Sequence, residues 1–390
     1  MSTQEHWKDV IQIRNPKMLG VNRIPAQRVP LGNPGDYKPC IARLPDGELL
    51  VVAFRPHKFD RTRRIGGREI QLVREDIILF RSQDGGVTWS QPEILDLPGR
   101  EPYFTILSDG TILITVHHLV QDIRNEAGYV QTYVHRSTDG GGTWETIRFP
   151  GEDLPGWQPD WPTCSSRTVL ELRDGGLVLG VGTKGGYDYL FRSHDRGATW
   201  QRGETCAFEL FTDEDKQKPR FPMWGEAVFW EAANGDLLAL NRVDSRDFPP
   251  LSGTDKPDGH WDHHDRLVLY RSQDGGKYWS FVELGSFYGE MYPALLKLHD
   301  GRLLLTFTVR DLRPPLGVRA IVGEKTESGF RFDFDHDRFM LDTKTPLDKE
   351  SGGGFGCTLQ LADSTLVTSY SYRAEDDLTH CEVVHWRLPG

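Results

Sequence analysis

The segment Ser82-Gln-Asp-Gly-Gly-Val-Thr-Trp89 decides the fold, because its pattern recurs three more times along the chain. The shared pattern is Ser-x-Asp-x-Gly-x-x-Trp, and the further copies span 137–144, 193–200 and 272–279. Each copy follows a run of alternating apolar residues, which is typical of a strand that enters a tight turn. In such a turn the Ser and Asp oxygens accept backbone N–H groups, the Gly adopts a positive φ, and the Trp ring is buried.

A second repeat is a hairpin signal, in which a two-residue turn separates two apolar runs. Successive turns lie 60 to 66 residues apart, so they divide the chain into six units of similar length. The turns are Asp46-Gly47, Asp109-Gly110, Asp174-Gly175, Asn234-Gly235, Asp300-Gly301 and a degraded Asp363-Ser364. Each unit supplies the strands of one small sheet. The sequence therefore predicts an all-β, six-bladed β-propeller that forms a single domain.

The predicted blades span approximately 36–98, 99–160, 161–222, 223–288, 289–350 and 351–390. Only two strands are evident after the last turn, so the sixth blade lacks one strand. We expect residues 7–14 to add the missing outer strand and to close the ring without a free edge. No long segment keeps the 3.6-residue apolar period of an amphipathic helix.

Composition limits the classes of partner. The formal net charge is −11 over 390 residues, so nucleic acid or an anionic membrane would have to bind a local patch against the overall field. The N-terminus is polar and no run of 18 apolar residues occurs, which predicts a cytoplasmic protein. The five cysteines are scattered without a CxxC pair, which predicts buried, reduced thiols and no metal site or other cofactor.

The repeat also aligns one residue of each unit at the predicted axis. The first strand of a propeller blade is innermost, so residues eight positions before each turn should meet at the mouth of the ring. These residues are Lys38, Glu101, Ser166, Glu226, Tyr292 and Phe355. Five of the six are charged or can form hydrogen bonds, which favours a polar site over simple packing.

Basic side chains follow the second strand of several units and should return to the same mouth. They are Arg55, His117, His118, Arg242, Arg310 and Arg373. A cationic rim on an acidic protein indicates an anionic ligand, because arginine forks bind carboxylates bidentately. Neighbouring residues in a strand point to opposite faces, so His117 and His118 should form hydrogen bonds rather than share a metal ion.

On these residues the chain resembles the exo-sialidase (neuraminidase) superfamily, whose repeated turn is called the Asp-box or BNR repeat. The resemblance runs from about Tyr37 to the C-terminus and implies hydrolysis of a terminal acidic sugar with retention. Tyr292, in Met-Tyr-Pro-Ala-Leu, stands where the family keeps its nucleophilic tyrosine, and Glu226, in Trp-Gly-Glu-Ala-Val, resembles the glutamate that takes the tyrosine's proton. Asp60 has the spacing of the family's acid/base aspartate after an Arg-Pro pair.

This set of residues suits the chemistry of sialic acids. These sugars carry a carboxylate on the anomeric carbon, which would repel an anionic nucleophile but not a neutral tyrosine. The free pKa of tyrosine is about 10, so the phenol needs a base such as Glu226 at neutral pH.

The family binds the sugar carboxylate with arginines, and the resemblance assigns one of them to Arg242. The first arginine of the family is replaced by Lys38, which keeps the charge but loses the fork. His264 lies nearest the spacing of the third, with Arg266 two residues further on. The other candidate substrate-binding residues are Arg55, Arg310, Glu101 and His118.

Two other functions fit the same residues. In a polysaccharide lyase, Lys38 and Arg242 would neutralise a uronate carboxylate while Tyr292 or one of the two histidines removes the C5 proton. In a carbohydrate-binding propeller the pocket would remain without the reaction. Structural roles also stay open: Tyr292 can cap the axis, Glu226 can form an inert pair with Arg242, and Asp60 can be a solvated loop residue.

Overall fold

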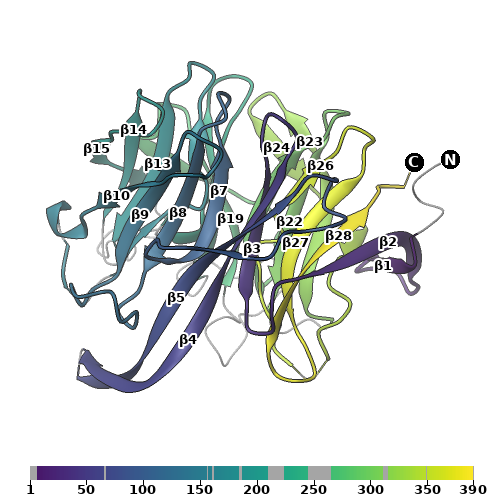
Figure 1. Ribbon diagram of the computed structural model, residues 1–390. Coiled ribbons are helices and arrows are strands. Elements are labelled where there is room, and N and C mark those ends of the chain that lie inside the picture. Colours follow the sequence, from purple (N-terminus) through teal and green to yellow (C-terminus); the bar gives the residue numbers. More distant parts are fainter. Residues whose placement is uncertain are drawn as a thin grey trace.

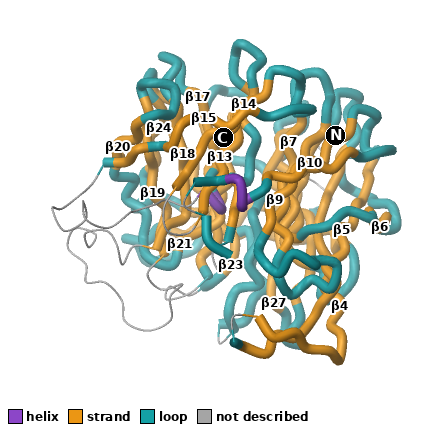
Figure 2. The backbone as a smooth tube through the Cα atoms, turned by 90° about the vertical axis from the view of Figure 1, so that its left-hand side faces the viewer, coloured by secondary structure: helices purple, strands orange, loops and turns teal. Residues whose placement is uncertain are grey.

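The computed structural model describes residues 7–65, 67–155, 157–159, 162–183, 187–209, 224–244, 265–310, 315–347 and 349–389. Within these ranges the regular structure is β-strand, apart from the 3₁₀ turns Gly151–Asp153 and Trp224–Glu226. The strands form separate sheets joined by loops, and in both views no described helix covers a sheet (Figures 1 and 2). None of the described elements is a helix of the length and hydropathy needed to cross a membrane.

Four sheets are built mainly from consecutive strands of the described chain. The first contains β3 (Tyr37–Arg43), β4 (Leu49–Ile65), β5 (Arg68–Ser82) and β6 (Glu93–Leu95). The second contains β7 (Arg100–Ile106), β8 (Ile112–His118), β9 (Gln131–Ser137) and β10 (Glu145–Phe149). The third contains β11 (Thr163–Ser165), β12 (Leu170–Glu171), β13 (Leu177–Thr183), β14 (Tyr187–Ser193) and β15 (Gln201–Thr205). The fourth contains β16 (Ala207–Phe208), β17 (Val228–Glu231), β18 (Leu237–Asp244), β19 (Asp265–Ser272) and β20 (Tyr278–Val282).

A ten-stranded sheet contains the rest of the described strands. It combines the two N-terminal strands, which precede these four sheets in the sequence, with the strands that follow them. Its first part is β21 (Glu290–Lys297), β22 (Leu303–Val309), β23 (Gly317–Thr326), β24 (Gly329–Phe332) and β25 (Arg338–Met340). Its last part is β26 (Thr358–Gln360), β27 (Leu366–Arg373) and β28 (Thr379–Trp386). The N-terminal hairpin of β1 (Asp9–Arg14) and β2 (Asn22–Leu31) lies between the two parts and pairs with both.

The N-terminal hairpin corrects one prediction. The strand that pairs with β28 is β2, from Ala26 opposite Trp386 onward, and not residues 7–14. Those residues contain β1, which pairs with β2 on one side and with β25 on the other. The sequence concealed β2 because it contains Pro25 and Pro30, and proline is depleted within strands.

The four repeated turns share one hydrogen-bond pattern. In the first of them Ser82 Oγ accepts the Gly86 N–H at 2.9 Å, Asp84 Oδ1 accepts the Thr88 N–H at 2.9 Å, and Trp89 Nε1 donates to Gly86 O at 3.0 Å. The other three copies repeat these contacts. The side chains of the motif therefore satisfy the backbone of the turn, as the sequence predicts.

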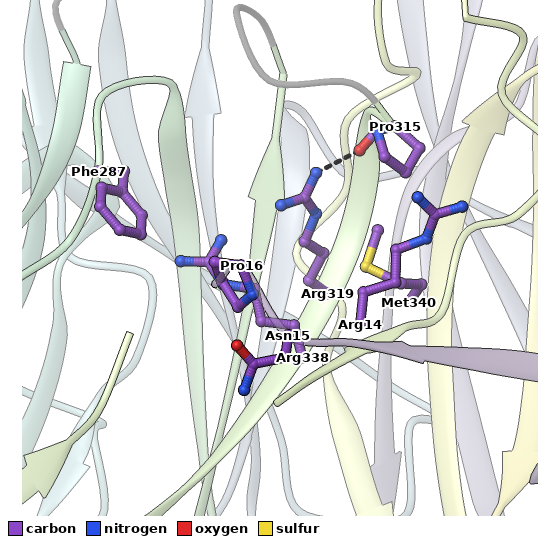
Figure 3. A pocket seen from close by; sticks show the side chains of 8 residues that line it. All are labelled: Arg14, Asn15, Pro16, Phe287, Pro315, Arg319, Arg338 and Met340. Carbon is purple, nitrogen blue, oxygen red and sulfur yellow. Dashed lines mark hydrogen bonds between the residues drawn. The ribbon is translucent and has the colours of Figure 1, made fainter. Parts of the chain in front are cut away.

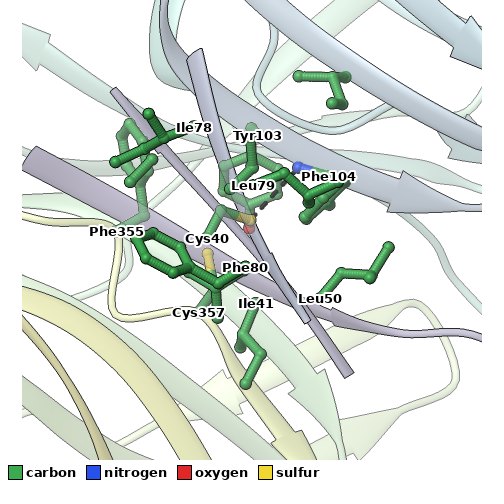
Figure 4. Packing of buried hydrophobic residues seen from close by; sticks show 14 of the residues in the cluster. Cys40, Ile41, Leu50, Ile78, Leu79, Phe80, Tyr103, Phe104, Phe355 and Cys357 are labelled. Carbon is green, nitrogen blue, oxygen red and sulfur yellow. Dashed lines mark hydrogen bonds between the residues drawn. The ribbon is translucent and has the colours of Figure 1, made fainter. Parts of the chain in front are cut away.

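Apolar side chains from the first sheet pack against residues from the second sheet and from the ten-stranded sheet. Around Cys40 of β3, this buried cluster includes Tyr103 of β7 and both Phe355 and Cys357, which precede β26 (Figure 4). Early and late parts of the chain thus share one core. All five cysteines are buried, in agreement with the prediction.

Candidate active site

Three of the predicted axial residues have an unusual backbone conformation. Lys38, Glu101 and Tyr292 have φ angles of 49°, 53° and 57°, in the left-handed region that residues with a Cβ seldom adopt. Each lies where the pairing of the first two strands of its unit is interrupted, between Tyr37 and Cys40, Arg100 and Tyr103, and Met291 and Ala294. Such bulges redirect side chains, and strain of about 1–3 kcal/mol per residue persists mainly at functional sites.

Salt bridges join residues from four units into one line of alternating charge. Lys38 Nζ lies 2.6 Å from Glu101 Oε1, and Arg167 Nη2 lies 2.5 Å from Glu101 Oε2. The same Arg167 Nη2 lies 3.5 Å from Glu226 Oε1. Lys38 and Arg167 are each only 3% exposed, so these contacts are shielded from solvent. A carboxylate from the second unit thus holds cations from its neighbours on either side.

The line of charges continues into the fourth sheet. Arg242 Nη1, on β18, lies 3.2 Å and 3.3 Å from the two oxygens of Glu226. The opposite side of this guanidinium binds Asp265 Oδ2 at 2.5 Å, which fixes its orientation from the adjacent strand β19. Glu226 itself ends the 3₁₀ turn that leads into this sheet.

Three cations surround Tyr292, which is 2% exposed. Arg310 Nη1 donates to its hydroxyl at 3.1 Å, Lys38 Nζ lies 4.3 Å from the ring centroid, and Arg242 Cζ lies 5.2 Å from it. We call Lys38, Glu101, Arg167, Glu226, Arg242, Tyr292 and Arg310 the axial cluster. No hydrogen bond joins the Tyr292 hydroxyl to Glu226 in the described part of the chain, but Arg242 contacts both residues.

The electrostatics of the axial cluster follow from burial and close cations. Burial raises the pKa of Tyr292, and the charges of Arg242 and Arg310 oppose this rise. Burial would also raise the pKa of Glu101, but Lys38, Arg167 and Arg100 together hold it well below its usual range. Glu101 is therefore ionised at neutral pH and neutralises part of the positive charge around Tyr292.

A second carboxylate lies behind Glu101. Arg100 contacts both Glu101, at 3.4 Å, and Glu75, at 3.1 Å. Burial raises the pKa of Glu75 to about 7 despite this cation, and Glu75 Oε2 has no hydrogen-bond partner. Glu75 therefore changes its charge near neutral pH, next to the axial cluster.

Replacement of Glu75 by glutamine should flatten the pH dependence of stability. The folded pKa lies above the unfolded value of 4.5, so the native state is favoured at low pH and loses stability as the pH rises from 4.5 to about 7. The loss is about 3 kcal/mol, and Glu75→Gln should abolish it. Urea unfolding at mildly acidic and mildly basic pH measures this difference. Glu69→Gln, at an exposed glutamate of the same strand, is the control, and parallel profiles for wild type and Glu75→Gln would contradict the prediction.

Other predicted site residues have partners outside the axial cluster. Arg55 forms a bidentate pair with the buried Asp36 at 2.6 Å and 2.8 Å. Arg266 is buried and lies 3.5 Å from Glu283. These two arginines therefore neutralise carboxylates that directly precede β3 and directly follow β20.

Asp60 and His118 also lie apart from the cluster. Asp60 is exposed on the long β4–β5 hairpin, which extends beyond the other strands (Figure 1), and it has no hydrogen bond or ion pair with the described residues. His118 is buried at the end of β8, beside Tyr133. His264 lies outside the described residues.

The structure adds Arg167, Arg100 and Asp265, which sequence reasoning missed. Arg167 and Arg100 are direct sequence neighbours of the axial positions Ser166 and Glu101. Their positions directly beside the aligned axial residues could have indicated from the sequence that they belong to the site. Among the described residues no group of three His, Cys, Asp or Glu side chains is placed to hold a metal ion.

A pocket of about 320 Å³, lined by none of the residues of the axial cluster, contains three arginines (Figure 3). Arg338 lies 2.6 Å from Glu290, Arg319 donates to the Pro315 carbonyl, and Arg14 donates to the side chain of Gln12. Each of these arginines has a partner within the protein, so their presence in the pocket does not by itself indicate an anionic ligand.

Structural comparison places the fold among known glycosidases. A protein of unknown function from Dyadobacter fermentans is 21% identical with a TM-score of 0.63, covering 96% of this chain and 99% of that one. A sialidase of Streptococcus pneumoniae is 11% identical with a TM-score of 0.59, covering 92% and 70%. An α-L-arabinofuranosidase of Fusarium graminearum is 14% identical with a TM-score of 0.58, covering 92% and 96%. At these identities the likeness shows a shared β-propeller-like fold.

Sequence comparison agrees with the repeats. A search of curated proteins finds no relative of this chain. The family model described as a BNR repeat-like domain matches residues 25–305, which is more than two thirds of the chain. Since its structural neighbours are sialidases and related BNR-repeat propellers, the chain belongs to the BNR repeat-like domain family.

Proposed function

We propose that the protein is a retaining glycoside hydrolase whose active site is the axial cluster. The observation that carries the proposal is the buried Tyr292, which three cations surround. One of these cations, Arg242, also donates hydrogen bonds to Glu226. Burial raises the pKa of Tyr292 and the surrounding cations offset part of this rise, so removal of the phenol proton depends on a base, the role assigned to Glu226. The solved neighbours, which include sialidases and an arabinofuranosidase, support the same class of reaction.

The ring that brings these residues together has six blades in this proposal. Four sheets of the described chain supply one blade each, and the ten-stranded sheet supplies two, one from β21 to β25 and one from β26 to β28 with β2. The N-terminal hairpin then fills the outer edge between the fifth and sixth blades, so neither keeps an exposed edge.

Catalysis starts with attack of the Tyr292 oxygen on the anomeric carbon. Glu226 takes the phenol proton and the glycosidic C–O bond breaks. Asp60 lies outside the axial cluster on the β4–β5 hairpin, so in this proposal the hairpin must bring it to the bound substrate, where it protonates the leaving oxygen. A water molecule, deprotonated by Asp60, then breaks the tyrosyl–sugar bond, and Glu226 returns the proton to Tyr292. In ligand-free sites such hydrogen bonds are often long, which fits the missing contact between Tyr292 and Glu226.

The proposed substrate carries a terminal acidic sugar, of the sialic acid type or related to it. Arg242 and Arg310 both contact Tyr292 and can bind a carboxylate on the attacked carbon. Lys38 also lies over the aromatic ring of Tyr292, but it is paired with Glu101. The substrate's carboxylate therefore competes with Glu101 for Lys38.

This competition predicts that Glu101→Gln binds N-acetylneuraminate more tightly than wild type. Glutamine keeps the shape but has only one acceptor oxygen and no charge, so it holds Lys38 and Arg167 less strongly than Glu101 does. Lys38 is then available to the ligand, and one charge-assisted hydrogen bond corresponds to roughly a tenfold change in Kd. Calorimetric titration with the free sugar measures the affinity. Glu324→Gln, which removes an exposed partner of Arg331, is the control. Unchanged or weaker binding by Glu101→Gln would show that the sugar's carboxylate does not use Lys38.

A second candidate is hydrolysis of a neutral sugar. The pairing of Lys38 with Glu101 favours it, because the cluster then needs no ligand carboxylate to balance this cation. Product analysis tests both candidates together with the lyase and the binding module. Hydrolysis of acidic or neutral aryl glycosides releases a reducing sugar, a lyase releases an unsaturated product that absorbs in the near ultraviolet, and a binding module releases neither. Absence of any released sugar across both glycoside classes would refute the hydrolase.

A further inference from the structure

A second, larger pocket opens beside the end of β8. Its volume is about 480 Å³, which is within the usual range of small-molecule sites. Its lining includes His118, Tyr129, Gln131, Tyr133, Arg148 and Glu152. These residues come from β8, β9, β10 and the segments that follow β8 and β10, and none of them belongs to the axial cluster.

The loop that forms one wall of this pocket is fixed from within. The Asn125 side-chain amide donates to the carbonyls of His118, Leu119 and Tyr129 at 3.1, 3.1 and 2.9 Å, and its oxygen accepts the Gly128 N–H at 3.3 Å. Arg63, from the β4–β5 hairpin, donates to the Asn125 carbonyl at 2.7 Å. The wall is therefore preformed, which lowers the entropy that binding would cost.

His118 is an independent sign that the pocket suits a polar ligand. The side chain lines the pocket and is 3% exposed, yet neither ring nitrogen has a hydrogen-bond partner. The closest acidic oxygen, Asp122 Oδ1, lies 3.7 Å from Nε2, which is too far for a hydrogen bond. An unpartnered buried polar group costs about 1–3 kcal/mol, so a ligand hydroxyl that reached it would be favoured.

The charges of the pocket indicate a neutral ligand. Its lining carries two arginines, Arg124 and Arg148, and two glutamates, Glu126 and Glu152. Arg148 is hydrogen-bonded to Glu152 and Arg124 to Asp122, so an anion would have to break an existing pair. Glu126 is exposed, so solvent screens its charge. This balance contrasts with the cationic surroundings of Tyr292.

The polar and aromatic groups of the lining match a sugar ring. Arg148 and Glu152 bind each other and Gln131 Oε1 accepts from the Tyr133 hydroxyl, but these planar groups have more donor and acceptor positions than these contacts use. Such groups bind neighbouring hydroxyls in pairs. Tyr129 and Tyr133 offer apolar ring surface with a polar tip. We propose that this pocket binds a neutral sugar unit.

The position of the pocket relates it to the axial cluster. His118 follows His117, which pairs with Arg100 across β7 and β8, and Arg100 contacts Glu101. A neutral sugar unit bound here would belong to the same glycan whose terminal unit reaches Tyr292. This link between the pocket and the axial cluster rests on the proposed function. Binding of the sugar in the pocket does not depend on it.

Saturation-transfer NMR with lactose, N-acetyllactosamine and xylobiose tests the pocket. At least one of these neutral sugars should receive saturation from the wild-type protein, and Tyr129→Ala should reduce the signal several-fold. Tyr278→Ala, at an exposed tyrosine of β20, should leave the signal unchanged. Glu152→Gln should weaken it as well, and this variant keeps the test valid if Tyr129→Ala fails to fold.

The outcomes separate this site from the proposed reaction. Tyr292→Phe should keep the signal whether or not the protein is a hydrolase, because Tyr292 does not line the pocket. The site is refuted if none of the three sugars gives a signal, if the signal survives both pocket substitutions, or if N-acetylneuraminate displaces the neutral sugars from it. A signal that depends on Tyr129 without any hydrolysis would refute the reaction and leave the site standing.

Discussion

Tyr292→Phe is expected to abolish turnover, with a loss of at least about a hundredfold, while the protein stays folded. The substitution removes one oxygen, the proposed nucleophile, and leaves the ring packed against Phe355 at a centroid distance of 5.8 Å. Its structural cost is one hydrogen bond from Arg310, or about 1 kcal/mol. Initial rates on aryl glycosides and the melting temperature measure the two effects separately.

Tyr37→Phe is the matched control for this prediction. Tyr37 precedes Lys38 in β3, and Lys38 Nζ lies 5.4 Å from its ring centroid. Loss of this hydroxyl should leave most of the activity, since Tyr37 has no described contact with Glu226 or Arg242. Full activity in Tyr292→Phe would exclude the nucleophile, and equal losses in both variants would indicate a general effect on the cluster.

Arg167→Met is expected to lower the free energy of unfolding by about 3–5 kcal/mol. Methionine fills a similar volume but leaves Glu101 and Glu226 without the cation that lies between them. It also removes the contact of the guanidinium with the Phe355 ring, at 4.6 Å. Both carboxylates lose the cation that they share in a shielded site, so the effect should exceed that of any single surface pair. Urea unfolding of the full chain measures it.

Arg331→Met is the control for Arg167→Met. Arg331 lies close to Glu324, but both side chains are mostly exposed, so solvent screens the pair. Its loss should change stability by less than about 0.5 kcal/mol. If the two arginine variants unfold at the same urea concentration, the line of charges does not hold the units together.

The alignment of repeats identified much of the candidate site from the sequence. Lys38, Glu101, Glu226 and Tyr292 occupy the same position in different units, and the structure brings them into one cluster. A repeat makes this inference possible, because residues at equivalent positions meet wherever the units pack side by side. The reaction assigned to them remains a prediction.

Other features could not be predicted from the sequence, for local physical reasons. Arg55, a candidate substrate-binding residue, is paired with the buried Asp36, and a sequence does not show such pairs. Arg167 lies one position beside the aligned column, so the alignment passed over it. The left-handed backbone at Lys38, Glu101 and Tyr292 was also invisible, since none of these residue types is typical of that conformation.

The pairing of β2 with β28 has a consequence during synthesis. Ala26 leaves the ribosome long before Trp386, its partner, has been made. Until then the backbone groups on that side of β2 have only water or a chaperone to bind, and such open strands invite aggregation. The slowest contact to form should therefore be the one between β2 and the last strand, β28, after translation rather than during it. Ribosome-bound chains that stop before β28 should be cleaved by protease within residues 22–31, and completed chains should resist cleavage there.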